Sequence, residues 1–146
     1  MNPVLYEKLR KIIVDAVPEI MDLKAGCFVD LGPCGIKEVI HTWSDDIHKG
    51  KKSVFTCIFE NSNGFCGVQH MQKKNIVKTL GRRITFIDVM SAIQKNGGPE
   101  SDSWQFYIED VLYIGFKRDG AFLWDMRQSL SDQSDECGEF LLQLFK

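Results

Sequence analysis

The segment from Thr85 to Pro99 constrains the fold most strongly, because it carries signals for both ends of one helix. Thr85 is a residue type that caps helix N-termini, and Asp88 stands three positions later, as in a capping box. The apolar residues that follow recur at helical spacing: Phe86, Val89, Met90 and Ile93. The run Asn-Gly-Gly-Pro, residues 96–99, then stops the helix. The sequence therefore predicts a helix at about residues 86–95 with one buried face.

Similar signals predict a helix near each end of the chain. Asn2 can cap the first helix and Pro3 fits its first position, while Pro18 ends or kinks it. Its apolar positions are Leu5, Leu9, Ile12, Ile13 and Ala16. Ser134 can cap a last helix at about residues 135–145, whose first turn is acidic, as the helix dipole favours.

Between these helices the pattern changes to that of strands. The strand candidates are residues 27–31, 39–43, 53–59 and 104–117. Asp119-Gly120 stands between two apolar runs, which predicts a β-hairpin near residues 111–124. A chain of 146 residues can bury one sizeable core, and no linker or repeat interrupts it. We therefore expect a single α+β domain, residues 1–146, with two helices packed on one side of a small antiparallel sheet.

Processing and membrane signals are missing from the sequence. Charged residues interrupt the apolar N-terminal segment, so we expect no signal peptide, and no apolar run reaches the roughly 18 residues of a membrane span. Cysteines in odd number without Cys-x-x-Cys spacing are typical of reduced thiols. They are Cys27, Cys34, Cys57, Cys66 and Cys137. We expect a cytoplasmic protein without a membrane partner.

Charge is distributed unevenly along the chain. Residues 47–87 hold eight basic residues and one acidic residue, a net charge of +7. Residues 88–146 hold five basic and eleven acidic residues, a net charge of −6. The basic residues that we expect to contact nucleic acid or another anionic partner are Lys73, Lys74, Lys78, Arg82 and Arg83. Phe65 and His70 lie among them and offer stacking surfaces. The alternative is that the lysines are solvated and the arginines pair with carboxylates.

Two groups of residues are candidates for metal binding. Cys57, Cys66 and His70 bring two thiols and an imidazole into fourteen residues, although zinc sites usually contain closer cysteine pairs. The alternative is that Cys57 is a buried thiol in a hydrophobic strand. The second group consists of the loop residues His41, Asp45, Asp46 and His48. We expect no cofactor, with zinc as the alternative, and identify no catalytic residue, because no phosphate loop, nucleophile elbow or zinc-protease helix is present.

Aromatic residues are concentrated around the predicted hairpin. Trp104, Tyr113 and Trp124 are candidates for contacting a protein partner if one face of the hairpin is open. If both faces are covered, these residues belong to the core, and this second interpretation is the better supported of the two.

Two segments carry a resemblance to a known family. LGRRITFIDVMSAI begins at Leu80, and LWDMRQSLSDQSDECGEFLLQLF begins at Leu123. They resemble a family of small uncharacterised phage and prophage proteins, in which a segment like LGRxITLxDVLxAI is followed by a strand with Trp-Asp and a final amphipathic helix. EIMDLKAGC, which begins at Glu19, is similar to the family's opening. The resemblance implies a phage or prophage setting and no particular activity.

We therefore expect a small, non-enzymatic accessory protein of phage or prophage type that acts by binding a host or phage macromolecule. A protein partner is favoured, and a homo-oligomer is a further alternative. The other function that we consider is a nucleic-acid-binding or metal-dependent nucleic-acid-processing protein that uses the basic region 47–87.

Overall fold

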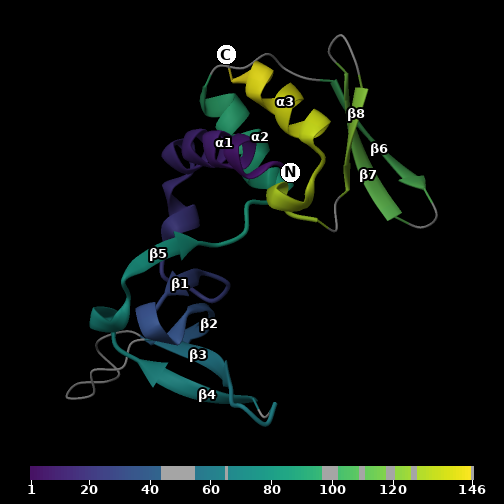
Figure 1. The fold of residues 1–146 in the computed structure, drawn as a ribbon. Coiled ribbons are helices and arrows are strands. Elements are labelled where there is room, and N and C mark those ends of the chain that lie inside the picture. The colour runs from purple at the N-terminus through teal and green to yellow at the C-terminus, as the bar shows by residue number, and fades with distance from the viewer. Residues whose placement is uncertain are drawn as a thin grey trace. The chain divides into compact units, whose positions relative to one another are not determined.

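The computed structural model describes residues 1–43, 55–64, 66–96, 102–108, 111–117, 121–125 and 128–145 (Figure 1). The chain forms two compact units. The first, here called the helical unit, comprises Met1–Pro18 and Ile84–Lys146, and the second, the sheet unit, comprises Glu19–Arg83. The expectation of one domain stays a prediction, because two compact units of one chain can still unfold in a single cooperative transition.

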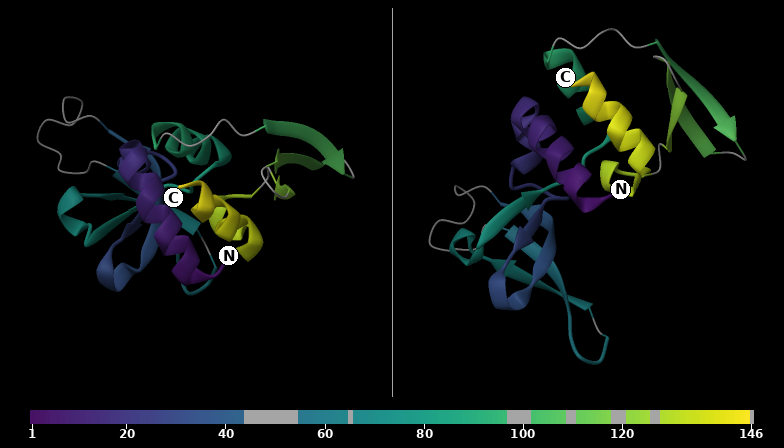
Figure 2. Two further views of the ribbon diagram at one scale, coloured as in Figure 1. Left: turned by 90° about the horizontal axis from the view of Figure 1, so that it is seen from above. Right: turned by 45° about the horizontal axis from the view of Figure 1, so that its top comes forward.

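The helical unit combines three helices with a small antiparallel sheet. Its elements are α1 (Pro3–Ala16), α2 (Phe86–Lys95), α3 (Asp135–Leu144), β6 (Asp102–Ile108), β7 (Val111–Lys117) and β8 (Ala121–Asp125). Strand β7 lies between β6 and β8 and pairs antiparallel with both. Helix α1 packs against α2 and α3, side by side with α3 in both views of Figure 2, and α3 packs against β8. The predicted α+β class, the three helices and the hairpin near residues 111–124 are confirmed.

Apolar side chains from all three helices meet in the interior of the helical unit. Those that are at most 1% exposed are Leu9, Ile13, Ile84, Val89, Ala92, Trp124, Leu130, Cys137 and Leu141. Burial of one large apolar side chain contributes about 1.5–3 kcal/mol, whereas helices of 10 to 14 residues are marginal in isolation. Packing of these faces, rather than helix propensity, therefore stabilises the unit.

Each helix begins at the capping residue that the sequence indicated. The Asn2 side-chain oxygen accepts from the Val4 N–H at 2.9 Å, and the Ser134 hydroxyl accepts from the Cys137 N–H at 3.2 Å. At the start of α2, the Asp88 carboxylate accepts from the Thr85 N–H at 2.9 Å. These side chains satisfy N–H groups that have no partner within the helix, so the three helix starts are fixed locally.

The sheet unit is one five-stranded antiparallel sheet with the strand order β4-β3-β2-β1-β5. Its strands are β1 (Phe28–Asp30), β2 (Ile36–Thr42), β3 (Phe55–Glu60), β4 (Cys66–Met71) and β5 (Lys78–Gly81). The register of β2 against β3 shifts between Val39 and His41, a β-bulge that bends the strand. The core under the sheet consists of Cys27, Val29, Leu31, Val39, Phe55 and Cys57.

Part of the sheet was predicted and part was not. The candidates at residues 27–31, 39–43 and 53–59 overlap β1, β2 and β3, whereas the candidate at residues 104–117 is two strands, β6 and β7. Strands β4 and β5 were missed. Every residue of β4 before Met71 is exposed, and β5 has only four residues, so neither carries the alternation or length that marks a strand in sequence.

Candidate functional site

The outer face of strands β2, β3 and β4 is the candidate site. Along β3, Phe55 and Cys57 point into the core, so the alternating residues Thr56 and Ile58 point outward. The β3–β4 register places His70 opposite Thr56 and Val68 opposite Ile58. His41 of β2 lies opposite Thr56 on the other side. We call this surface, with Trp43 directly after β2, the indole–imidazole face; it comprises His41, Trp43, Thr56, Ile58, Val68 and His70.

Three rings are grouped at one end of this face. The Trp43 ring centroid lies 5.2 Å from that of His41 and 4.7 Å from that of His70, and both pairs meet edge to face. The Thr56 hydroxyl and Nδ1 of His70 are 3.0 Å apart, which is a hydrogen bond in either tautomer of the ring. Thr56 is only 4% exposed, because neighbouring side chains cover it. The bond to this buried hydroxyl fixes the orientation of His70.

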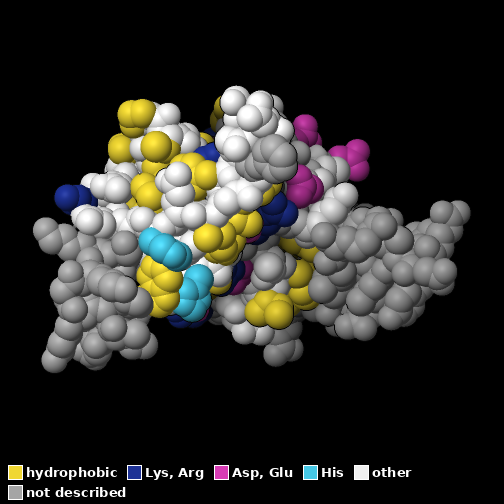
Figure 3. All heavy atoms as spheres, turned by 90° about the horizontal axis from the view of Figure 1, so that it is seen from below, with side chains coloured by type: hydrophobic (Ala, Val, Ile, Leu, Met, Phe, Trp, Pro, Cys, Tyr) yellow, Lys and Arg dark blue, Asp and Glu magenta, His cyan; other side chains and the backbone are white. Residues whose placement is uncertain are grey.

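The remainder of the face is unusually apolar for a surface. Ile58 is 48% exposed and Val68 is 58% exposed, although both are large aliphatic residues. Figure 3 shows the two described histidines with a hydrophobic side chain between them and further hydrophobic side chains nearby. Exposed apolar residues that gather around polar rings are typical of a binding surface.

The five predicted basic residues divide between two places in the sheet unit. Lys73 and Lys74 are exposed and lie in the short 3-10 helix Lys73–Asn75, which begins one residue after the end of β4. They stand three and four residues after His70 in the chain. Lys78 begins β5, at the opposite edge of the sheet from β4, and Arg82 and Arg83 follow that strand. The Arg83 guanidinium lies 5.6 Å from the centre of the Phe28 ring. Two of the five predicted residues therefore follow the indole–imidazole face closely along the chain.

The first predicted metal group is not brought together. Cys57 is fully buried on the inner side of β3, and burial raises the pKa of its thiol. Cys66 and His70 are exposed on the outer side of β4, where four residues of extended strand separate them by about 13 Å. No group of three metal-ligating side chains occurs in the described part of the chain. Asp45, Asp46 and His48 of the second group lie outside it.

Of the three aromatic candidates for partner binding, Trp124 follows the favoured alternative, a place in the core. Trp124 is 1% exposed, and its ring centroid lies 6.0 Å from that of Phe86, so it belongs to the core of the helical unit and presents no surface to a partner. The side chains of Trp104 and Tyr113 lie outside the described residues, as does Phe65. Sequence alone could not distinguish a covered from an open hairpin, because burial of Trp124 depends on packing of helices that lie far away in the chain.

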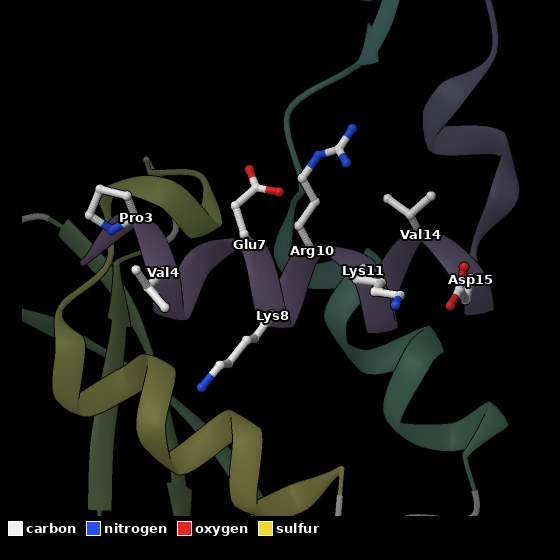
Figure 4. A pocket seen from close by; sticks show the side chains of 8 residues that line it. All are labelled: Pro3, Val4, Glu7, Lys8, Arg10, Lys11, Val14 and Asp15. Atoms are coloured by element: carbon white, nitrogen blue, oxygen red, sulfur yellow. The ribbon is translucent and has the colours of Figure 1, made fainter.

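A hollow of the surface runs along α1 (Figure 4). All eight residues that line it belong to this helix: Pro3, Val4, Glu7, Lys8, Arg10, Lys11, Val14 and Asp15. Charges of both signs alternate with two valines there, and among the described residues the lining comes from this one helix. This is the solvent-facing side of an amphipathic helix and holds no convergent group of polar side chains.

The combination of Trp43, His41 and His70 was not predicted as one site. His41 was considered as a metal ligand and His70 as a stacking surface, but the register that joins them depends on β4, which the sequence did not reveal. Comparison of the chain with family models, curated proteins and solved structures found no match. No helix within the described ranges has the length and apolar character that crossing a bilayer requires.

Proposed function

We propose that this chain is a non-enzymatic accessory protein, of phage or prophage type and cytoplasmic, that binds single-stranded nucleic acid on the indole–imidazole face. The observation that carries the proposal is the grouping of Trp43 with two exposed imidazoles, and exposed lysines follow His70 three and four residues later in the chain. A cytoplasmic setting agrees with five cysteines that are all free thiols.

Stacking would supply the sequence-independent part of the affinity. An aromatic ring that stacks on a base contributes about 1–3 kcal/mol, and every base has a face to offer. His41 and His70 meet Trp43 edge to face, so the exposed imidazoles keep ring faces on which a base can stack. The hydrogen bond between Thr56 and His70 holds one of these rings in place before the ligand arrives, which lowers the entropic cost of binding.

Charge would supply the remaining part. Lys73 and Lys74 continue the chain from β4, and no acidic residue occurs anywhere between Asn61 and Ile87. Across the whole sheet unit ten basic residues face seven acidic ones, a net charge of +3, whereas the helical unit has eight basic and thirteen acidic residues, a net charge of −5. A phosphate backbone is therefore attracted to the sheet unit rather than to the helical unit.

A protein partner is the second candidate, and the exposed side chains of Ile58 and Val68 favour it. Aliphatic groups of this size contribute to protein interfaces through burial, and such binding depends weakly on salt. Salt dependence and the effect of lysine removal therefore separate the two candidates.

The decisive experiment measures fluorescence anisotropy of a labelled oligothymidylate and of a matched duplex, from about 50 to 200 mM salt. We expect preferential binding of the single strand. Trp43→Ala should weaken it about 10-fold or more, and Trp43→Phe should restore much of the loss, because a ring is again present to stack. Replacement of both Lys73 and Lys74 by alanine should reduce the logarithmic salt slope by about 1.4.

The matched control is the double replacement of Lys8 and Lys11, two exposed lysines of α1, which should leave the affinity and the slope unchanged. Absence of salt-sensitive binding to either probe at low ionic strength would refute nucleic-acid binding and leave the protein partner. Equal affinity for duplex and single strand, with no effect of Trp43→Ala, would refute stacking.

A further inference from the structure

The two edges of the five-stranded sheet differ in how they are protected. Strands β4 and β5 are the edge strands. An unprotected edge offers a row of unpaired N–H and C=O groups to another strand, and proteins usually block such rows with short strands, bulges, charged residues or proline. Strand β5 has four residues, begins with exposed Lys78 and is followed by two arginines. Its pairing with β1 also shifts register between Phe28 and Val29. Edge β5 is therefore protected.

Strand β4 has none of these devices. It pairs with β3 through six consecutive residue pairs without a register shift, from Glu60–Cys66 to Phe55–Met71. Its sequence, CGVQHM, contains no lysine, arginine, aspartate, glutamate or proline. Among the described residues, no backbone hydrogen bond reaches the outer edge of β4. Within the described ranges of the chain, the longest regular edge of this sheet is thus left open.

We propose that the outer edge of β4 pairs antiparallel with β4 of a second copy of this chain, around a two-fold axis. The two five-stranded sheets would then continue into one another across the axis. A two-fold interface sets a strand against itself, so any charged residue near the axis would meet its own copy, and β4 carries no such charge. Because β4 carries no charged side chain, its edge also has no charge pattern that would favour a partner other than a second copy.

Val68 is the residue that we place at the axis. When Val68 lies opposite Val68 of the second copy, five of the six β4 residues find a partner residue. In this register the outward side chains of both copies stay on the same face of the joined sheet. Two valines that are each 58% exposed in the single chain would then cover one another. The indole–imidazole faces of the two copies would adjoin, since Val68 and His70 belong both to this face and to the edge. One open edge of six residues forms a small interface, so we expect a dissociation constant in the micromolar range.

Sedimentation velocity of the full chain, from about 5 to 500 µM and with a reducing agent present, tests the proposal. We expect a monomer–dimer equilibrium without nucleic acid. Val68→Lys should raise the dimer dissociation constant at least about 10-fold, because two like charges then meet at the axis. Val77→Lys is the matched control, since Val77 is 71% exposed in the same unit but lies outside β4, and it should dimerise as the wild type does.

A monomer over the whole concentration range would overturn the proposal, as would equal dimerisation of Val68→Lys and the wild type. Circular dichroism of Val68→Lys confirms that the variant is folded. Binding of a short oligothymidylate by the wild type is measured in parallel. Dimerisation of a wild type that does not bind the oligonucleotide would support this proposal and refute the proposed function, and a wild type that binds it but stays monomeric would do the reverse.

Discussion

Gly81 is the position at which one added carbon atom should destabilise the sheet unit most clearly. It ends β5, has a φ of +84° and lies against Ile20 and Met21. A Cβ atom at this position would stand 2.9 Å from the Ile20 carbonyl oxygen and 2.8 Å from the Met21 sulfur. The Met21 sulfur can move, but the Ile20 carbonyl belongs to the backbone. The residue after Gly81, Arg82, donates its N–H to the same carbonyl oxygen at 2.9 Å, which holds the two segments together.

The expected loss for Gly81→Ala has two parts. A side chain in the left-handed φ region costs about 1–2 kcal/mol, which the lower entropy of the unfolded alanine chain offsets by about 0.4–1 kcal/mol. The overlap with the Ile20 carbonyl adds about 1–3 kcal/mol, as in overpacked cores. Gly26 has a similar φ of +94° but no atom within 4 Å of a Cβ, so Gly26→Ala isolates the first part.

Urea unfolding followed by far-ultraviolet circular dichroism measures both variants. We expect a loss of about 2–4 kcal/mol for Gly81→Ala and of about 1 kcal/mol or less for Gly26→Ala, with unchanged dependence on denaturant. Equal losses for the two variants would refute the steric argument, because they would mean that the close approach of Ile20 costs nothing.

Two further predictions concern the cysteines and the helix caps. With a thiol reagent at about pH 8, exposed Cys34 and Cys66 should react quickly. The buried thiols of Cys27, Cys57 and Cys137 should react only after unfolding, and burial raises the pKa of Cys137 to about 12. Fast labelling of more than two thiols in the native protein would contradict this prediction. Since the unfolded Cys137 thiol ionises near its ordinary value of 9.0, its contribution to stability should fall as pH rises above that value. Ser134→Ala should lower stability by about 1 kcal/mol in thermal unfolding, because the Cys137 N–H loses its acceptor. Ser131→Ala, at an exposed serine outside α3, should change it by less than about 0.5 kcal/mol.

The helices and the hairpin could be predicted because their signals are local. A capping side chain such as Asn2 or Ser134 bonds to an N–H two or three residues away, so the information lies within one turn. The hairpin between β7 and β8 follows from Asp119-Gly120 and the apolar runs beside it. Strand β4 carries no such local signal. Its residues before Met71 are all exposed, so they show no alternation of apolar and polar side chains.

The candidate site could be predicted only in pieces. The sequence indicated the basic character of residues 47–87 and the stacking potential of His70. It did not indicate that His70 stands in one row with Thr56 and His41, or that Cys57 and Cys66 lie on opposite sides of the sheet. Both facts follow from the β2–β3–β4 register. A slip of one residue would move every side chain of the shifted strand to the other face of the sheet.

The sequence by itself determined the α+β class, the starts of the helices and the separation of a basic middle from an acidic C-terminal part, because caps, periodicity and charge are properties of neighbouring residues. Only the tertiary structure decided that Trp43 meets His70, that Trp124 is buried and that β4 is an edge strand of its sheet. Each of these depends on segments that are distant in the chain, and strand register and packing, rather than local preference, select which of them meet.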